Sequence, residues 1–168
     1  MATPEPTSLG IEGNVMTVRL PRALSLRPAG EEDIAFCEIL RRSNMAAYHS
    51  ARGVALDPER FVAGWSAFEN FMLQADGEVA GMLRLLVADD ALEIRDLQLL
   101  PAHRNRGIGS WAVDWTLAEA DRRGLARVRL RVFVENPALR LYSRLGFKVD
   151  SMDEQGKVQM SCVAGAST

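Results

Sequence analysis

The sequence lacks several features that would place a protein in a class at once. Its two cysteines, Cys37 and Cys162, are too few for a disulfide framework and form no metal-ligand pattern. The formal net charge is only −2, without the strong basic excess of a nucleic-acid or membrane-surface binder. The apolar runs fall far short of a membrane span, and the first residues do not have the layout of a signal peptide. We therefore expect a cytoplasmic protein without a metal ion, a nucleic-acid partner or a membrane partner.

What the chain does have is enough apolar material for one core. It has 168 residues, of which 48% are hydrophobic, and this suits a single globular domain. No repeat, linker or low-complexity segment divides it. Residues 1–20, which include Pro4 and Pro6, are expected to form a partly mobile N-terminal extension with a candidate strand at 15–20. Residues 21–168 are expected to form the domain.

Hydrophobic spacing predicts strands in runs with helices between them. Asp57 and Pro58 are typical of a helix start, and Phe61, Trp65 and Phe68 continue the helical spacing. The expected strands are 24–30, 71–75, 78–88, 91–100, 126–136 and a final hairpin over 147–163, and the expected helices are 31–48, 58–69, 107–123 and 137–146. This order of elements predicts an α/β domain.

The stretch HRNRGIGS, residues 103–110, combines arginines with glycines at the start of a predicted helix. The first N–H groups of a helix are unpaired and lie at its positive dipole end. Gly107 and Gly109 have no Cβ, so an anion can approach these groups closely, and Arg104 and Arg106 add positive charge. The stretch therefore indicates a phosphate site, or alternatively a plain strand-to-helix turn with solvated arginines. No Gly-Lys-Ser/Thr follows, which excludes a P-loop.

Two sequence elements resemble one known family. LQLLPAHRNRGIG, residues 97–109, resembles motif A of the GNAT superfamily of N-acetyltransferases, which has the form Arg/Gln-x-x-Gly-x-Gly/Ala after an apolar strand. ENPALRLYSRLGF, residues 135–147, resembles a second element of that family, in which an asparagine precedes a short helix with a tyrosine and then Gly-Phe. The two elements stand in the family's order and spacing, and the resemblance extends from about residue 24 to 163.

The resemblance implies a fold and a cofactor. The family fold is a mixed, mostly antiparallel central sheet of six to seven strands flanked by about four helices. In the family, motif A holds the pyrophosphate of acetyl-coenzyme A, and the fourth and fifth strands splay apart to expose backbone to its pantetheine arm. The residues that the resemblance assigns to the cofactor are Gln98, Leu99, Leu100, Arg104, Arg106, Gly107, Ile108, Gly109, Ser110, Asn136 and Tyr142.

The resemblance also implies a general acid. Tyr142 stands where the family places the proton donor for the departing thiolate, although a tyrosine here also suits packing over the sheet. Asn136 is implied to bond the pantetheine arm, and it equally fits a helix N-cap before Pro137.

For the general base and the residues that contact the acceptor, the sequence leaves alternatives. Asp96 lies near the loop among apolar residues and is a candidate catalytic base, but a surface ion pair with Arg95 or Arg131 is the alternative, and the family often uses a water chain. Tyr48, at the end of the first long helix, is a candidate substrate contact or a residue of local packing.

The function implied by the resemblance is transfer of an acetyl group from acetyl-coenzyme A to a primary amine of a small molecule or peptide, by direct attack on the thioester. A non-catalytic acyl-CoA-binding or regulatory module with the same fold is the alternative. The sequence does not identify the acceptor. Relatives dimerise through their C-terminal strands, so the hairpin 147–163 is a candidate homodimer contact.

Overall fold

The computed structural model describes residue 21 and residues 23–165. The predicted N-terminal extension 1–20 and its candidate strand lie outside the described residues. Within them, seven strands form one sheet in the order β1-β2-β3-β4-β5-β7-β6, and only the β4–β5 pair is parallel. The strands are β1 Leu24–Pro28, β2 Glu69–Ala75, β3 Glu78–Ala88, β4 Ala91–Leu99, β5 Arg127–Phe133, β6 Lys148–Met152 and β7 Lys157–Val163.

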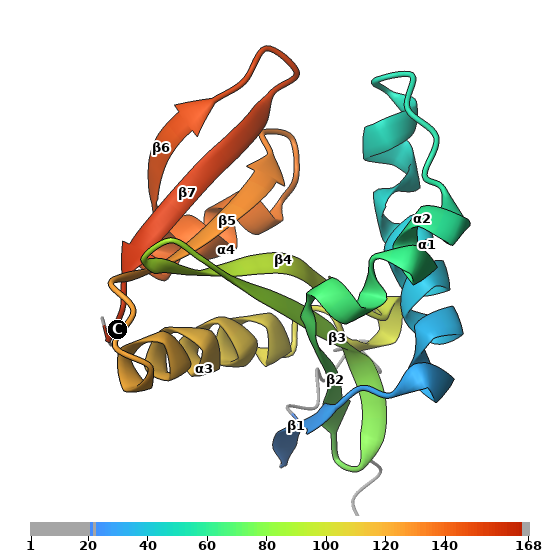
Figure 1. Cartoon of the computed structure of the whole chain (residues 1–168), viewed down its shortest axis with the longest axis horizontal. Helices are drawn as coiled ribbons and strands as arrows, with labels where there is room; N and C mark the ends of the chain where they lie inside the picture. The colour runs from blue at the N-terminus through green and yellow to red at the C-terminus, as the bar shows by residue number, and fades with distance from the viewer. Residues whose placement is uncertain (1–20, 22, 166–168) are drawn as a thin grey trace, which may run out of the picture.

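Four α-helices of the described residues accompany the sheet (Figure 1). They are α1 Ile34–Ser50, α2 Pro58–Ala63, α3 Ile108–Arg122 and α4 Ala138–Arg144, with short 3₁₀ turns η1 Glu31–Asp33, η2 Trp65–Ala67 and η3 Pro101–His103. The predicted α/β class, with a mostly antiparallel sheet and about four helices, is confirmed. In the part of the chain that the structure describes, no helix is long and apolar enough to cross a membrane.

The two faces of the sheet bury separate apolar clusters. In β2, Leu73 packs with the cluster that contains α3 and α4, whereas its neighbour Met72 packs with the cluster under α1 and α2. In β3, Leu83 and Met82 divide in the same way. Because successive side chains of a strand point to opposite faces, α3 and α4 cover one face and α1 and α2 cover the other. Each of these buried side chains contributes about 1.5–3 kcal/mol relative to leaving it exposed.

The predicted helix over 58–69 is wrong in its second half. Asp57 caps α2 by accepting from the N–H of Glu59, but the helix ends at Ala63 and β2 already begins at Glu69. Gly64 ends the helix, and the 3₁₀ turn η2 follows it. The helical spacing of the aromatic residues was misleading because their rings gather around one buried arginine, which is described below.

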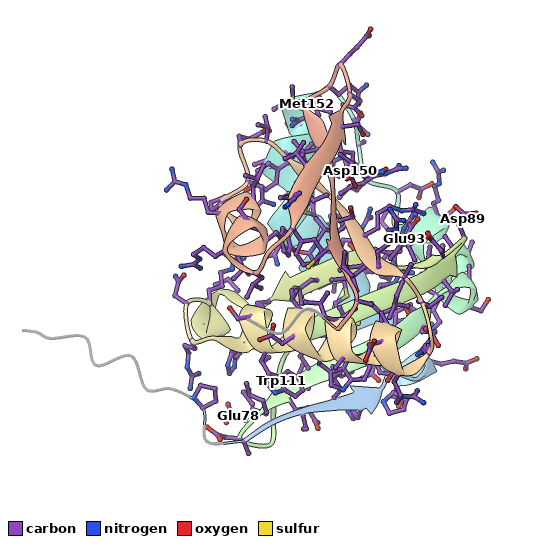
Figure 2. The ribbon with its side chains drawn as sticks, turned by 90° about the vertical axis from the view of Figure 1, so that its left-hand side faces the viewer. Glu78, Asp89, Glu93, Trp111, Asp150 and Met152 are labelled. Atoms are coloured by element: carbon purple, nitrogen blue, oxygen red, sulfur yellow. The ribbon has the colours of Figure 1, made fainter. Side chains whose placement is uncertain are left out.

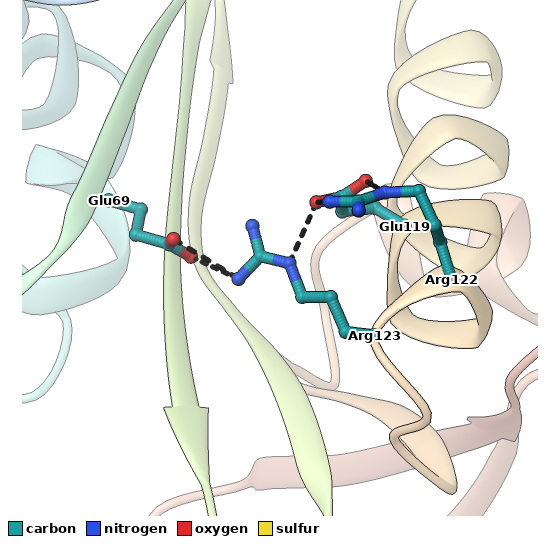
Figure 3. A network of polar contacts seen from close by, with 4 residues as sticks. All are labelled: Glu69, Glu119, Arg122 and Arg123. Carbon is teal, nitrogen blue, oxygen red and sulfur yellow. Dashed lines mark hydrogen bonds and ion pairs between the residues drawn. The ribbon is translucent and has the colours of Figure 1, made fainter.

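Arg123, just after α3, ties that helix to the start of β2 on the sheet face that α3 covers (Figure 3). Its guanidinium donates to Glu69 at the start of β2 at 2.9 Å and to Glu119 of α3 at 2.7 Å. Arg122 donates to the same Glu119 carboxylate, and the two arginines lower the pKa of Glu119 to about 2. Since partly exposed ion pairs add little free energy, this network chiefly fixes the direction of α3.

The central feature of the sheet is the place where β4 and β5 separate. Their parallel pairing covers only Ala91–Ile94 of β4. Just beyond it, the register of β4 against β3 shifts, so that Arg95 is an extra residue opposite no partner. This bulge puts Asp96 on the same sheet face as Glu93, although simple alternation predicts opposite faces.

Candidate functional site

A cleft of about 880 Å³ opens where β4 and β5 separate. Its lining comes from the end of β4, the loop before α3, the first turn of α3, and α4, with three residues of α1. Most of the residues that sequence analysis assigned to a cofactor line this one cleft: Gln98, Leu99, Arg104, Gly107, Ile108, Gly109, Ser110, Asn136 and Tyr142.

The loop before α3 presents backbone donors to the cleft. Asn105 and Gly107 both have left-handed backbone conformations, with φ of 58° and 78°, and Gly107 is the residue that caps α3. The first N–H groups of α3 have no carbonyl one turn earlier to bond, and the helix dipole adds positive charge there. A Cβ on Gly109 would lie 3.3 Å from Leu141 of α4, so a larger residue would crowd the cleft. The loop therefore has the geometry of an anion site.

The end of β4 forms one wall of the cleft, but Leu100 does not belong to it. Leu97, Gln98 and Leu99 line the cleft on the edge of β4 that β5 leaves uncovered. Leu100, which was predicted to contact the cofactor, packs instead with the cluster under α1. Its N–H donates to the Ala80 carbonyl, so this group is used in the pairing with β3. The correction follows from the length of β4, which ends one residue earlier.

Asn44 of α1 is a cleft residue that sequence analysis missed. Its side-chain amide donates to the Leu99 carbonyl at 3.0 Å and to the Gln98 side chain at 3.1 Å. Its oxygen accepts from Arg104 at 2.7 Å, so this residue links α1, β4 and the loop. An asparagine in a helix gives no signal in the sequence, because its partners lie more than 50 residues away.

Arg106 and His103, two other basic residues of the loop, contact each other. A terminal guanidinium nitrogen of Arg106 lies 3.2 Å from Nδ1 of His103, and the His103 side chain is buried. The contact between these two side chains stabilises the conformation of the loop.

A second, smaller pocket of about 140 Å³ adjoins the cleft on the side of α1. Residues of both hollows form the wall between them: Met45, Leu97, Gln98, Asn136, Ala138 and Tyr142. A ligand in the cleft and a ligand in the pocket would therefore meet at these side chains.

Tyr142 is the ionisable group at this junction. It is 7% exposed, its ring packs against Phe147 with centroids 5.8 Å apart, and within residues 23–165 its hydroxyl has no hydrogen-bond partner. Burial, together with the nearby Asp96 carboxylate, raises the pKa of Tyr142 to about 12. The phenol therefore keeps its proton throughout the neutral range, as a proton donor must.

Asp96 is engaged in ion pairs, though not with the partners that were expected. One carboxylate oxygen accepts from Arg41 of α1 at 3.1 Å and the other from Arg84 of β3 at 3.1 Å. Arg95 pairs with Glu93 instead. The bulge at Arg95 explains the difference, because it moves Asp96 toward β3 and α1. Both oxygens of this carboxylate are thus bonded to guanidiniums, and its role as a base stays a prediction.

Arg84 is the buried arginine at the centre of the aromatic residues after Asp57. Its guanidinium lies 4.3 Å from the ring centroid of Phe61 and 4.5 Å from that of Phe68. It donates to Asn70, while its remaining terminal nitrogen has no hydrogen-bond partner among the described residues and faces these rings. The cation is thus held by one carboxylate, one amide and π faces.

Asn136 and Tyr48 both reach the cleft while serving the fold. The Asn136 side chain accepts from the N–H of Ala138 at 3.0 Å, which is the predicted capping contact at α4. The Tyr48 ring stacks on Phe133 with centroids 5.9 Å apart and lines the larger cleft. Its neighbour His49 is the one that lines the smaller pocket.

Comparison with known proteins identifies the class to which this fold and cleft belong. A model of the GNAT acetyltransferase family matches residues 35–147, which is more than half of the chain and includes both the loop before α3 and α4. The chain therefore belongs to the GNAT acetyltransferase family.

Individual relatives agree with this assignment. Streptothricin acetyltransferase of Streptomyces lavendulae is 31% identical over 106 residues, which are 61% of this chain and 51% of that protein, so this chain spans about half the length of that relative. An N-acetyltransferase PaiA from Thermoplasma acidophilum, solved in complex with coenzyme A, matches 84% of this chain and 99% of its own at 20% identity and a TM-score of 0.65. Spermidine N-acetyltransferase from Vibrio cholerae, in complex with CoA and spermine, matches 84% and 95% at 17% identity and a TM-score of 0.67.

The ion pairs of Asp96 lead to a stability prediction. Asp96→Ala leaves the buried Arg84 without its carboxylate, so we expect the free energy of unfolding to fall by about 3 kcal/mol or more. Asp90→Ala is the matched control, because Asp90 pairs with Arg127 at an exposed site and should cost less than about 1 kcal/mol. Urea unfolding of both variants measures the difference. Equal losses would show that Asp96 does not hold Arg84, and would strengthen its candidacy as a base.

Proposed function

We propose that this chain is an acetyl-CoA-dependent N-acetyltransferase that moves an acetyl group to a primary amine of a small molecule or peptide. The observation that carries the proposal is the meeting of two hollows at Tyr142: a cleft with the N–H groups of α3, and a smaller pocket on the other side. Direct attack of an amine on a thioester needs this layout, with donor and acceptor on either side of one junction. Membership of the family and the coenzyme A in the Thermoplasma acidophilum structure support the donor.

The cleft residues suit acetyl-CoA in shape and charge. We assign its phosphates to the N–H groups of Gly107, Ile108 and Gly109 at the start of α3, with Arg104 also lining the cleft. On the edge of β4 that β5 leaves uncovered, the backbone groups of Leu97 and Leu99 are available to the pantetheine amides, whereas the backbone of Gln98 pairs with Met82 of β3. No group of three His, Cys, Asp or Glu side chains that suits a metal ion occurs among the described residues.

The chemistry asked of the chain is modest. When bound, acetyl-CoA supplies an activated thioester. The amine nitrogen forms the new bond to the carbonyl carbon, the carbon–sulfur bond breaks, the amine gives up a proton and the sulfur leaves with one. In this proposal Tyr142, which lines the cleft and keeps its proton at neutral pH, gives that proton to the sulfur.

The assignment of the cofactor's phosphates to the loop before α3 leads to a binding prediction. Gly107→Glu puts a negative charge at the N-terminus of α3, so the affinity for acetyl-CoA should fall roughly 100-fold or more, because like charges at one site repel. Gly77→Glu is the matched control, since Gly77 also has a positive φ, of 82°, and nothing lies within 4 Å of a Cβ at either position. Isothermal titration calorimetry with acetyl-CoA compares them. Equal affinities in the two folded variants would remove the loop from the cofactor site.

The position of Tyr142 leads to a kinetic prediction. Tyr142→Phe should lower kcat roughly 100-fold while the affinity for acetyl-CoA stays near that of the wild type, because it removes a proton donor and little volume. Since the pKa of Tyr142 is raised to about 12, loss of its proton should not limit the wild-type rate at pH 7 to 10. Release of the coenzyme A thiol measures kcat of the variant and the pH dependence of the wild-type rate. Wild-type turnover in the variant would leave Tyr142 a packing role, and a wild-type protein that binds acetyl-CoA without turnover would favour the non-catalytic alternative.

We also propose that the chain forms a homodimer through the β6–β7 hairpin. β6 is an edge strand, and Met152 is its last residue (Figure 2). The side chains of Val149 and Met152 are 59% and 61% exposed. Exposed apolar groups on an open edge favour association. Sedimentation equilibrium should give a dimer that dissociates when Val149 and Met152 are both changed to Lys, but not in Val87→Lys, which changes a similarly exposed valine of β3. A monomeric wild type would contradict this proposal.

A further inference from the structure

The smaller pocket next to Tyr142 is lined by positive charge. Besides Tyr142 of α4, its ionisable lining comes from four elements: Arg41 and His49 of α1, Arg95 and Asp96 of β4, Arg131 of β5, and Lys157 of β7. Phe133 pairs with Lys157 across β5 and β7, and Arg131 lies two residues before Phe133, so these side chains share one face of the sheet. The cations therefore converge on one hollow rather than pointing to opposite sides.

The carboxylates in and beside this pocket are already engaged. Asp96 accepts from both Arg41 and Arg84. Glu93, which lies on the same face, accepts from Arg129 and Arg95. No carboxylate of the lining is left to receive a positively charged ligand.

Arg131 and Lys157 are left without such compensation. Within residues 23–165, neither side chain has a carboxylate partner. Asp153, the acid whose charge acts on Lys157, uses its carboxylate to accept backbone N–H groups of the β6–β7 turn. The Lys157 ammonium lies 5.4 Å from the centroid of the Phe133 ring, where the chain holds it beside the pocket.

The direction of two pKa shifts agrees with this picture. Burial and the positive charges of Arg131, Arg95 and Arg41 lower the pKa of Lys157. Burial and the charges of Arg41, Lys157 and Arg52 lower the pKa of His49, which is therefore mostly neutral at pH 7. Burial is the largest cause of both shifts, and the surrounding positive charges act in the same direction.

We propose that the acceptor is a small amine that also carries a carboxylate, as in an α-amino acid, and that Arg131 and Lys157 bind this carboxylate. The inference rests on the proposed function and names its substrate class. Arginine and lysine are the side chains that pair with carboxylates, and here they have no such partner in the described chain. A pocket of about 140 Å³ holds roughly ten water-sized groups, which suits a small acceptor. A polyamine, which has only positive charges to offer, would be repelled.

The test compares pairs of acceptors that differ only in charge. Acetylation of α-amino acids is measured beside that of their α-carboxamides, with spermidine as a cationic acceptor and dipeptides as a second source of carboxylate. In wild-type protein kcat/KM should be highest for a free amino acid. A higher kcat/KM for dipeptides would support recognition of a carboxylate but would identify the acceptor as a peptide. A higher value for spermidine, or equal values for acids and amides, would overturn the inference.

Variants identify the binding groups. Arg131→Gln and Lys157→Gln should each lower the acid-to-amide ratio of kcat/KM about tenfold or more, as expected when a charged hydrogen-bond partner is lost. Comparing this ratio between proteins cancels the different amine pKa values of acid and amide. Arg127→Gln is the control, because Arg127 lies on the same strand face but pairs with Asp90 outside the pocket. An unchanged ratio in both pocket variants would overturn the assignment.

A binding measurement separates the two proposals. Calorimetry of the protein saturated with coenzyme A should show binding of an amino acid and not of its amide, whether or not turnover occurs. Selective binding without turnover would contradict the transferase proposal and support the carboxylate site. Turnover of amines without selective binding of the acid would support the transferase and contradict the carboxylate site.

Discussion

The separation of β4 from β5 after Ile94 is the constraint on which the site depends. Inside a sheet, backbone groups that lose their neighbouring strand need other partners, because unpaired polar groups are costly. Here the uncovered edge of β4 looks into a cleft, and the side chain of Asn44 bonds the Leu99 carbonyl from α1. The start of α3 and the capped start of α4 lie at the same opening. One break in a ladder of hydrogen bonds thus creates the cleft, exposes strand backbone and brings two helix starts together.

The ion pairs around Asp96 hold this opening in shape. Asp96 follows the bulge in β4, and its two oxygens connect that strand to α1 through Arg41 and to β3 through Arg84. Arg84 is in turn enclosed by the rings that follow Asp57, so α2 and η2 are tied to the same point. A carboxylate used in this way fixes geometry, and it is no longer available to attract a cation in the adjoining pocket. The ion pairs of Asp96 therefore both fix the geometry of the site and influence which ligand charge the pocket accepts.

Short-range patterns in the sequence predicted the parts of the site that lie close together in the chain. The loop before α3 and Tyr142 of α4 were found because each sits in a compact motif, and the capping of α4 by Asn136 follows from the Asn-Pro pair. Partners that lie far apart in the chain were missed. Arg84 stands between two leucines in an apolar strand, and nothing local shows that Asp96 and three aromatic rings surround it. The bulge at Arg95 likewise reverses a face assignment that alternation alone cannot correct. The cytoplasmic location stays a prediction.

The positive pocket also bears on how an amine would react there. An amine attacks only in its neutral form, and a free aliphatic amine is protonated at neutral pH. Burial and surrounding positive charge both disfavour the ammonium form and lower the amine pKa, and both act in this direction on Lys157 beside the pocket. A carboxylate on the acceptor would supply the attraction that the ammonium cannot. Under this proposal, the charges that select the acceptor also favour its reactive form. A strong dedicated base would then be less necessary, which agrees with an Asp96 already occupied by two arginines.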